Sequence, residues 1–163
     1  MRLRSLLCSV ALFALAVSGE ARAASSDTDF LQSALRVEVG QYDIGLIGRR
    51  KAAARPTKAF AAQLEDEASV AVAALKKIAS QEGVAVQEDA ALRAKAQYQD
   101  LQGRSGRDFD RTLAHDEMID ANIAIDTFGD EARHGDDPAL RRFAAAQLSK
   151  LRADLKMSRD LGG

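Results

Sequence analysis

Apolar residues recur every three or four positions along most of the chain, which is the spacing of one face of an α-helix. The clearest stripe consists of Phe60, Leu64, Ala68, Ala71, Leu75 and Ile78. Pro56 comes just before this stripe, where proline suits the first turn of a helix, and Gly83 follows it as a glycine suited to a helix end. The pattern predicts one long helix between these two residues.

Similar patterns predict a helix before this one and a shorter helix after it. The first helix is expected to start near Thr28, a residue suited to capping a helix, and to end in the basic residues 49–51. Its predicted inward stripe is Phe30, Leu31, Ala34, Leu35, Val39, Tyr42, Leu46 and Ile47. The shorter helix is expected from about Glu88 to Leu101.

Two further helices are predicted in the last third of the chain. A break at residues 103–106 precedes a long helix that ends at His134 and Gly135, with one face formed by Phe109, Leu113, Ala121, Ile125 and Phe128. Asp137 followed by Pro138 is the start signal of the last helix. The predicted inward set of that helix is Leu140, Phe143, Ala144, Leu148, Leu151 and Leu155.

Four long helices and a short one define an all-α architecture. The short joins at 54–56 and 135–138 require antiparallel neighbours, so we predict an antiparallel four-helix bundle with the short helix between the second and third long helices. Composition agrees, because the 163 residues are 47% hydrophobic but only 5% aromatic, and alanine and leucine dominate over β-branched residues. The length fits one domain.

The N-terminal residues predict a secretion signal. Arg2 and Arg4 precede an apolar stretch of about 12 residues, which is shorter than the ~20 that a membrane-spanning helix needs. The stretch is followed by Ala21-Arg22-Ala23, the small-x-small pattern of a cleavage site. We therefore expect residues 1–23 to be removed after Ala23, residues 24–163 to form the mature domain, and the protein to be periplasmic or secreted.

Cleavage would change both the thiol content and the charge. The single cysteine, Cys8, would be lost, so thiolate chemistry and disulfides are not expected in the mature chain. Three positive charges and one negative charge would go, which changes the formal net charge from −1 to −3. Mixed charges of this kind disfavour nucleic acid as a partner, and no membrane span is expected in the mature chain.

Several short segments resemble a known family. They are Lys58-Ala59-Phe60-Ala61-Ala62-Gln63-Leu64-Glu65-Asp66-Glu67, Leu101-Gln102-Gly103 with Phe109-Asp110-Arg111 after it, and Leu148-Ser149-Lys150-Leu151. In order and spacing the chain resembles domain-of-unknown-function family 4142 over residues 30–161. The resemblance implies a secreted bacterial protein of ferritin-like helical fold, of the kind labelled outer-membrane or exported.

The departures from this family concern histidine. The resemblance implies histidines at three positions that here are Ala68, Ala121 and Asp154, and an inward acidic residue near Gln41, with Asp43 beside it. Ser149 stands where the family has proline. If the histidines bind metal in relatives, the resemblance implies that this member has lost that site. Ala68 and Ala121 also lie within apolar stripes, which predicts that both face the bundle interior.

The chain has only two histidines, and their positions do not suit a shared metal site. Glu131-Ala132-Arg133-His134 has the Glu-x-x-His spacing of a carboxylate-bridged metal site, but it ends a helix, where a cationic residue interacts with the helix terminus. His115 lies 19 residues earlier on the same predicted helix, ~28 Å away, so one subunit cannot bring both to one metal. We therefore assign no catalytic, cofactor-binding or metal-binding residue, and expect no cofactor.

Two clusters of charge leave alternatives open. Glu38, Glu117 and Asp154 each lie near an inward stripe, so they either share the interior, with bound cations or raised pKa values, or sit at the stripe edges and reach solvent or arginine. A shift of one residue in the facing of a helix moves such a side chain from the interior to the stripe edge, so we favour positions at the edges. The second cluster consists of five basic residues: Arg49, Arg50, Lys51, Arg55 and Lys58. They could bind an anionic polymer or a lipid headgroup, or they could form a solvated corner between two helices. We favour the solvated corner.

Two functions are consistent with these observations. The first is a non-enzymatic exported bundle that binds a protein, the envelope or a small ligand. The sequence does not identify this protein or envelope partner. The alternative is a ferritin-like protein that binds a divalent metal such as iron at a carboxylate-only site formed by Glu38, Asp43, Glu117 and Asp154. Oxygens of these side chains that lie within ~5 Å of one another would favour the second function, whereas scattered, outward-facing carboxylates would exclude it.

Overall fold

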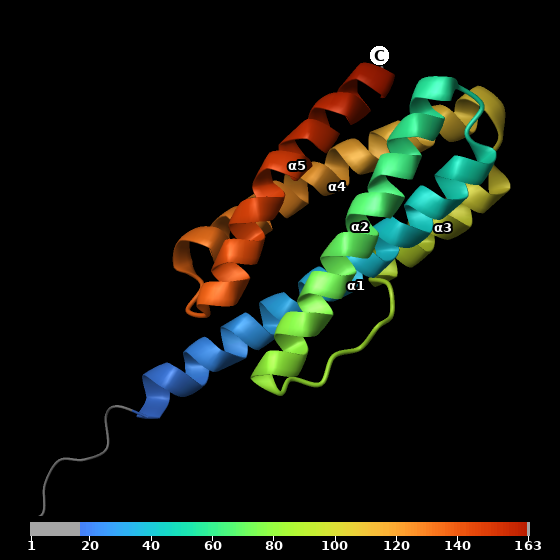
Figure 1. Cartoon of the computed structure of the whole chain (residues 1–163). Helices are drawn as coiled ribbons and strands as arrows, with labels where there is room; N and C mark the ends of the chain where they lie inside the picture. The colour runs from blue at the N-terminus through green and yellow to red at the C-terminus, as the bar shows by residue number, and fades with distance from the viewer. Residues whose placement is uncertain (1–16, 163) are drawn as a thin grey trace, which may run out of the picture.

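The computed structural model describes the backbone of residues 17–162 and the side chains of residues 26–162, and it confirms the all-α prediction (Figure 1). The helices are α1 (Val17–Lys51), α2 (Arg55–Glu82), α3 (Leu92–Gly103), α4 (Gly106–His134) and α5 (Pro138–Gly162). No strand occurs between residues 17 and 162. The short helix lies between the second and third long helices, as the sequence predicts.

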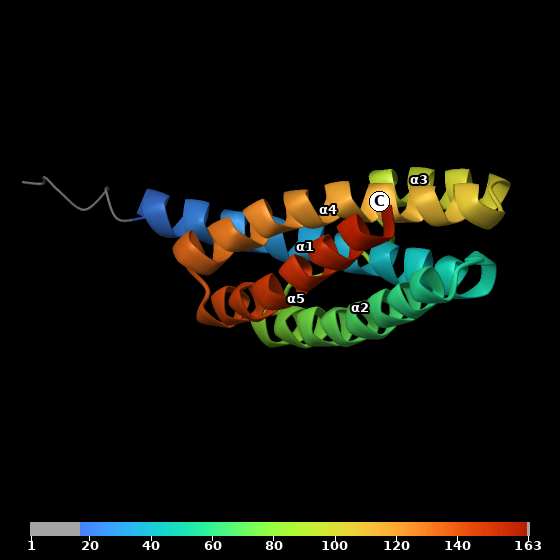
Figure 2. The ribbon, with the colours of Figure 1, turned by 90° about the horizontal axis from the view of Figure 1, so that it is seen from above.

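The long helices form two antiparallel pairs. Helix α1 packs along α2, and α4 packs along α5, each pair being joined by three residues (Figure 2). Contacts between the two pairs are much sparser. The long connection from α2 to α4 carries α3, which lies against α1 and α4. The interface between the two pairs is therefore the loosest part of the bundle interior.

Three helix boundaries follow the local signals. Pro56 lies in the first turn of α2, and Gly83 ends α2 with a left-handed backbone (φ 65°) that glycine adopts without steric cost. Asp137 caps α5, because its Oδ1 accepts hydrogen bonds from the backbone N–H groups of Ala139 and Leu140, both at 2.7 Å. All three signals were predicted at these positions.

The predicted start of the first helix is wrong. Helix α1 begins at Val17 and runs through Thr28 without a break. The residues just before Thr28 are mostly compatible with helix, so the helix extends past this cap residue toward the N-terminus. Asp27 is used elsewhere, since its carboxylate accepts hydrogen bonds from the backbone N–H groups of Asp136 (3.2 Å) and Asp137 (2.7 Å) in the α4–α5 turn. The short helix α3 also starts later than predicted, at Leu92.

The apolar interior consists of two clusters at opposite ends of the bundle. The first, called the α1-start cluster, contains Phe30, Leu31, Ala34, Leu35, Ala71, Leu75, Ile78, Ala79, Phe128, Leu140, Phe143 and Ala144. The second, called the α1-end cluster, contains Ile44, Ile47, Ala52, Phe60, Leu64, Leu101, Phe109 and Leu113. All six residues of the predicted α2 stripe are buried.

Two of the predicted inward positions are wrong by one or two residues. Tyr42 is 37% exposed, and Ile44 takes the buried position in its place. In α5, Asp154 is buried while Leu155 is only half-buried. Both differences have one cause: the packing of neighbouring helices, and not apolarity alone, decides which side of each helix is covered.

Glycines on α1 allow the close approach of α2. A Cβ atom added at Gly45 would lie 2.5 Å from the backbone nitrogen of Glu65 and 2.8 Å from the carbonyl oxygen of Ala61. Both are backbone atoms of α2, so they cannot move aside as a side-chain tip could. A Cβ at Gly48 would similarly lie 2.5 Å from the Cβ of Ala61. The α1–α2 pair therefore depends on small residues at this crossing.

We expect Gly45→Ala to lower the free energy of unfolding by about 1–3 kcal/mol, because the added methyl group must push two backbones apart. Gly103→Ala is the matched control, since a Cβ there would meet nothing within 4 Å. Urea unfolding of both variants measures the difference. Equal stability of the two variants would contradict the proposed contact.

Candidate functional site

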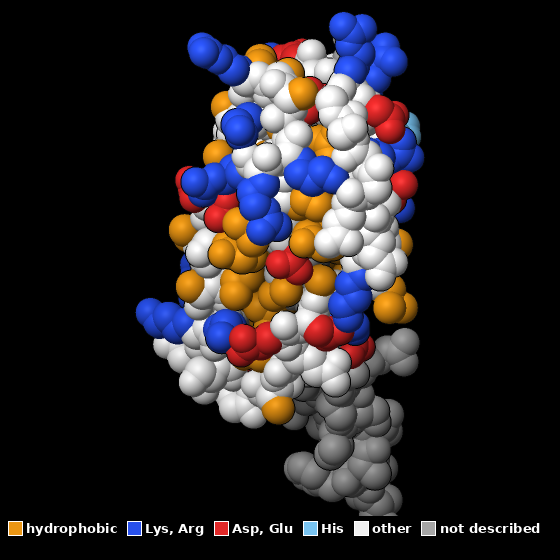
Figure 3. All heavy atoms as spheres, turned by 90° about the vertical axis from the view of Figure 1, so that its right-hand side faces the viewer, with side chains coloured by type: hydrophobic (Ala, Val, Ile, Leu, Met, Phe, Trp, Pro, Cys, Tyr) orange, Lys and Arg blue, Asp and Glu red, His pale blue; other side chains and the backbone are white. Residues whose placement is uncertain are grey.

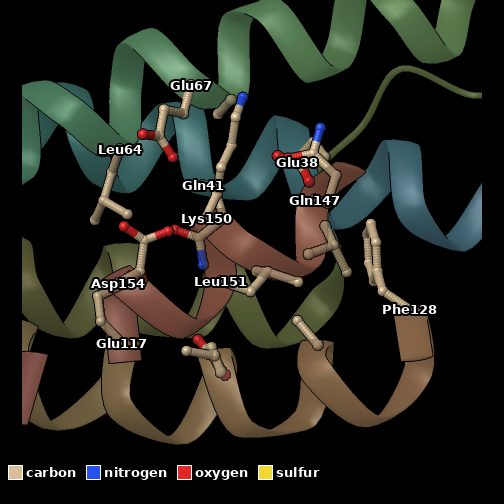
Figure 4. Close-up of a pocket in the computed structure, with 15 residues that line it drawn as sticks. Glu38, Gln41, Leu64, Glu67, Glu117, Phe128, Gln147, Lys150, Leu151 and Asp154 are labelled. Carbon is tan, nitrogen blue, oxygen red and sulfur yellow. The ribbon is translucent and has the colours of Figure 1, made fainter. Parts of the chain in front are cut away.

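A layer of polar side chains separates the two apolar clusters. These side chains line a cavity of about 50 Å³, here called the carboxylate cavity, where the two helix pairs face each other (Figure 4). Each long helix contributes at least one carboxylate: Glu38 from α1, Glu67 from α2, Glu117 from α4 and Asp154 from α5. Asp120, Gln41, Gln147 and Lys150 complete the polar lining.

Three of these carboxylates are buried, so the expectation that they sit at stripe edges is wrong. Glu38 is 9% exposed, Glu117 is 3% exposed and Asp154 is 7% exposed. Each occupies a position of an inward stripe, three residues after Leu35 in the first case and four after Leu113 in the second. The helical period therefore turns these acidic side chains inward together with their apolar neighbours, and the sequence spacing contained this signal.

Burial raises the pKa values of the two glutamates. The pKa of Glu38 rises to about 8, mainly through loss of hydration, with Lys150 opposing the rise and Asp154 adding to it. The pKa of Glu117 also rises to about 8 through burial, and the negative charge of Asp120 raises it further. A hydrogen bond from Gln41 partly offsets this effect. Both carboxyl groups therefore hold a proton at neutral pH.

Asp154 links the carboxylates of different helices. Its pKa rises to about 7, first through burial and then through the negative charge of Glu67, while Lys150 lowers it. Gln63 donates a hydrogen bond from Nε2 to its Oδ1 at 3.3 Å. Asp154 in turn raises the pKa values of Glu38 and Glu117. The acidic groups therefore behave as one electrostatically coupled set.

Some polar groups that line the cavity have no hydrogen-bond partner for at least one of their atoms. Among the described residues, Glu38 has neither a hydrogen bond nor an ion pair, although it is more than nine-tenths buried. The Oε1 atom of Gln41 is buried and likewise has no hydrogen-bond donor. Buried polar groups normally find such partners, so unsatisfied ones in a cavity indicate a place for water, a proton or a ligand.

The positions singled out by the family resemblance meet in this cavity. Ala68, Ala121 and Asp154, the three expected histidine positions, all line it, and so does Gln41. Ala68 is 1% exposed and Ala121 is 6% exposed, which confirms that both face inward. Asp43 does not line the cavity, so the predicted set of four carboxylates is wrong in this member.

The carboxylates line one cavity, but their oxygens are too far apart to bind one ion as they stand. Within the described part of the chain, no group of three or more histidine, cysteine, aspartate or glutamate side chains lies close enough to hold a metal ion as the side chains now stand. The carboxylate cavity therefore supplies acidic oxygens from four directions, and side-chain rotation would be needed to bring them onto one ion.

The other candidate residues lie apart from the cavity. His115 is exposed, and His134 is also exposed and contacts Asp130 at 2.8 Å (Nδ1 to Oδ1). Glu131, three residues earlier on α4, is buried, and burial together with the nearby acidic groups, Asp27 foremost, raises its pKa to about 7. Glu131 and His134 thus do not converge on one point, as expected for a helix end.

The five basic residues form a corner with partners of its own. Arg49 pairs with Glu65 at 3.0 Å. Lys51 donates hydrogen bonds to the carbonyl oxygens of Leu101 and Gln102, at 3.0 and 2.6 Å, and thereby holds the end of α3. Arg50, Arg55 and Lys58 are exposed. This arrangement agrees with a solvated corner.

The surface carries mixed charges. On the face shown in Figure 3, Lys and Arg side chains are interspersed with Asp and Glu around a central group of hydrophobic side chains. Within residues 17–162, none of the helices combines the length and the apolarity that crossing a bilayer requires.

These features define the chain as an all-α helical bundle with an acidic cavity inside it. The protein belongs to the family described as domain of unknown function DUF4142, whose model matches residues 13–161. This match confirms the resemblance seen in the sequence. Neither the curated proteins nor the solved structures contain a match to the chain.

The raised pKa of Glu117 makes the stability of the fold depend on pH. Between its ordinary value of 4.5 and about 8, the folded protein keeps a proton that the unfolded chain releases. This stabilisation is complete below pH 4.5. For one group it decreases by ~1.4 kcal/mol per pH unit as the pH rises from there, and it is lost once the pH has risen through 8. Glutamine resembles the protonated carboxyl group and does not titrate.

We therefore expect Glu117→Gln and the wild-type protein to have similar free energies of unfolding near pH 4, and the variant to be the more stable at pH 8. Urea unfolding across this pH range measures both. Parallel stability curves for the two proteins would show that Glu117 does not hold a proton in the fold.

Proposed function

We propose that this is an exported, non-enzymatic helical-bundle protein that binds a divalent cation in the carboxylate cavity. The observation that carries the proposal is the burial of Glu38, Glu117 and Asp154, from three different helices, around one cavity. Burying acidic groups is costly unless something compensates their charge. Protons do so at neutral pH, and a divalent cation that displaces them would do so as well.

The donor set favours a hard cation. Carboxylate and amide oxygens suit Ca²⁺, Mn²⁺ and Mg²⁺, and carboxylates also bind Fe²⁺ in helical bundles. A cavity of about 50 Å³ has room for one ion with a water molecule or two. The binding step would replace the protons of Glu38 and Glu117 by the ion, while rotation of these side chains would bring their oxygens onto it.

The lining of the cavity supports binding rather than catalysis. It contains no serine, cysteine or histidine among the described residues, so the usual nucleophiles and the most common general base do not face this space. Lys150 is the one cationic side chain in the lining. It partly offsets the negative charge of the carboxylates, and a bound cation would take over this role.

We expect Mn²⁺ or Ca²⁺ to bind the metal-free protein at one site per chain and to raise its melting temperature, because an ion that binds only the folded state stabilises it. Isothermal titration in buffers of different ionisation enthalpy should show release of about two protons per ion near pH 7. Affinity should accordingly rise with pH.

Two variants and a control locate the site. Glu117→Gln and Asp154→Asn each remove one carboxyl group that could bind the ion, and should weaken binding by at least about tenfold. Glu131→Gln removes another buried carboxyl group that lies outside the cavity, and it should leave the affinity unchanged. An absence of binding for every divalent ion, or an equal loss in all three variants, would contradict the proposal.

Export is supported by the N-terminal residues described above. Cleavage after Ala23 would leave a chain that begins three residues before Asp27 and would remove no member of either apolar cluster. We expect the protein in the periplasmic fraction of expressing cells to begin at Ala24, as read by N-terminal sequencing. Ala23→Leu should leave the precursor uncleaved, because the cleaving peptidase requires a small residue there. A cytoplasmic, full-length wild-type protein would contradict export.

A further inference from the structure

A second cavity lies between α1, α3 and α4. It measures about 150 Å³ and is here called the α3 cavity. Its walls are mostly apolar, with Phe30, Val37, Ile44, Ile123 and Phe128 among them. Protein interiors are packed so closely that voids larger than a water molecule are rare. A cavity of this volume and lining is large enough for a molecule with a single six-membered ring.

The charges at the cavity wall are already neutralised. Asp120 accepts hydrogen bonds from Nε of Arg93 at 2.5 Å and from the side-chain amide of Gln97 at 2.6 Å. Both partners are on α3, so these contacts also hold α3 over the cavity. An ionic ligand would find no unpaired charge there, whereas a neutral ligand would leave this pair intact.

One polar atom at the wall remains free. Gln41 lies between the two cavities and lines both. Because its hydrogen bond lowers the pKa of Glu117, Gln41 donates this bond through its amide nitrogen. Its Oε1 atom is buried and has no donor among the described residues. A ligand with an O–H or N–H group would supply the donor.

Helix α3 provides a route into the cavity. Leu101, at its C-terminal end, is the only residue of α3 that is buried. Most of the other contacts of the helix are exposed and polar, such as Arg93 with Asp120, although Tyr98 also packs on the α1-end cluster. Such elements open at low free-energy cost compared with a buried helix. A ligand can therefore enter without disruption of either helix pair.

We propose that the α3 cavity binds a small neutral molecule with one apolar ring and one hydrogen-bond donor, of the size and chemistry of phenol, whose donor group contacts Oε1 of Gln41. This site is separate from the carboxylate cavity, and the proposal does not require that a cation binds there.

The test compares phenol with toluene, which has the same shape but carries a methyl group in place of the hydroxyl group. The mature protein is titrated with each compound and followed by methyl NMR. The methyl groups of Ile123 line only the α3 cavity, and those of Leu64 line only the carboxylate cavity. We expect saturable shifts at Ile123, smaller ones at Leu64, and phenol binding roughly three- to tenfold tighter than toluene, the ratio expected for one hydrogen bond.

The variant Gln41→Leu keeps the approximate volume of the side chain but removes the acceptor. It should abolish the preference for phenol and retain the binding of toluene, which also shows that the variant is folded. The variant Asp154→Asn, which changes only the carboxylate cavity, should bind phenol as the wild type does. Retention of phenol binding in that variant separates this proposal from the cation proposal.

Two results would overturn the inference. Unchanged Ile123 signals at saturating phenol would mean that the α3 cavity holds water only. Equal affinity for phenol and toluene in the wild type, or a phenol preference that survives Gln41→Leu, would refute the role of Gln41.

Discussion

The burial of acidic side chains across the middle of the bundle is the constraint on which the rest of the structure depends. Glu38, Glu117 and Asp154 divide the interior into two apolar clusters, and the free energy of hydration lost by their carboxyl groups must be offset there. Protonation meets this requirement at neutral pH. The two apolar clusters therefore supply the packing that holds a costly polar layer in place.

The unequal contacts between helices explain where the cavities lie. Small residues such as Gly45 and Gly48 let α1 and α2 approach closely, so little space is left inside this pair. The two pairs meet less closely, and both cavities lie where they face each other or where α3 bridges them. Gln41 stands between the two cavities, which places one amide group in contact with both.

The sequence predicted the helices well and the polar layer poorly, for related reasons. Periodicity and the signals at Pro56, Gly83 and Asp137 depend on local physics, which a sequence displays directly. Whether Glu38 faces the interior depends on the rotation of α1 against three other helices, and an error of one residue decides the answer. Reading the stripe through Tyr42 and Leu155 rather than through Ile44 and Asp154 produced that error.

The capping of the α4–α5 turn by Asp27 ties the start of the domain to residues made more than a hundred positions later. During synthesis, the backbone N–H groups of Asp136 and Asp137 gain these acceptors only after nearly the whole chain exists and returns to its beginning. Contacts between residues so distant in sequence slow folding, because the long loop between them must close first. The last turn between two helices therefore gains its caps only when the first and last parts of the domain are both present.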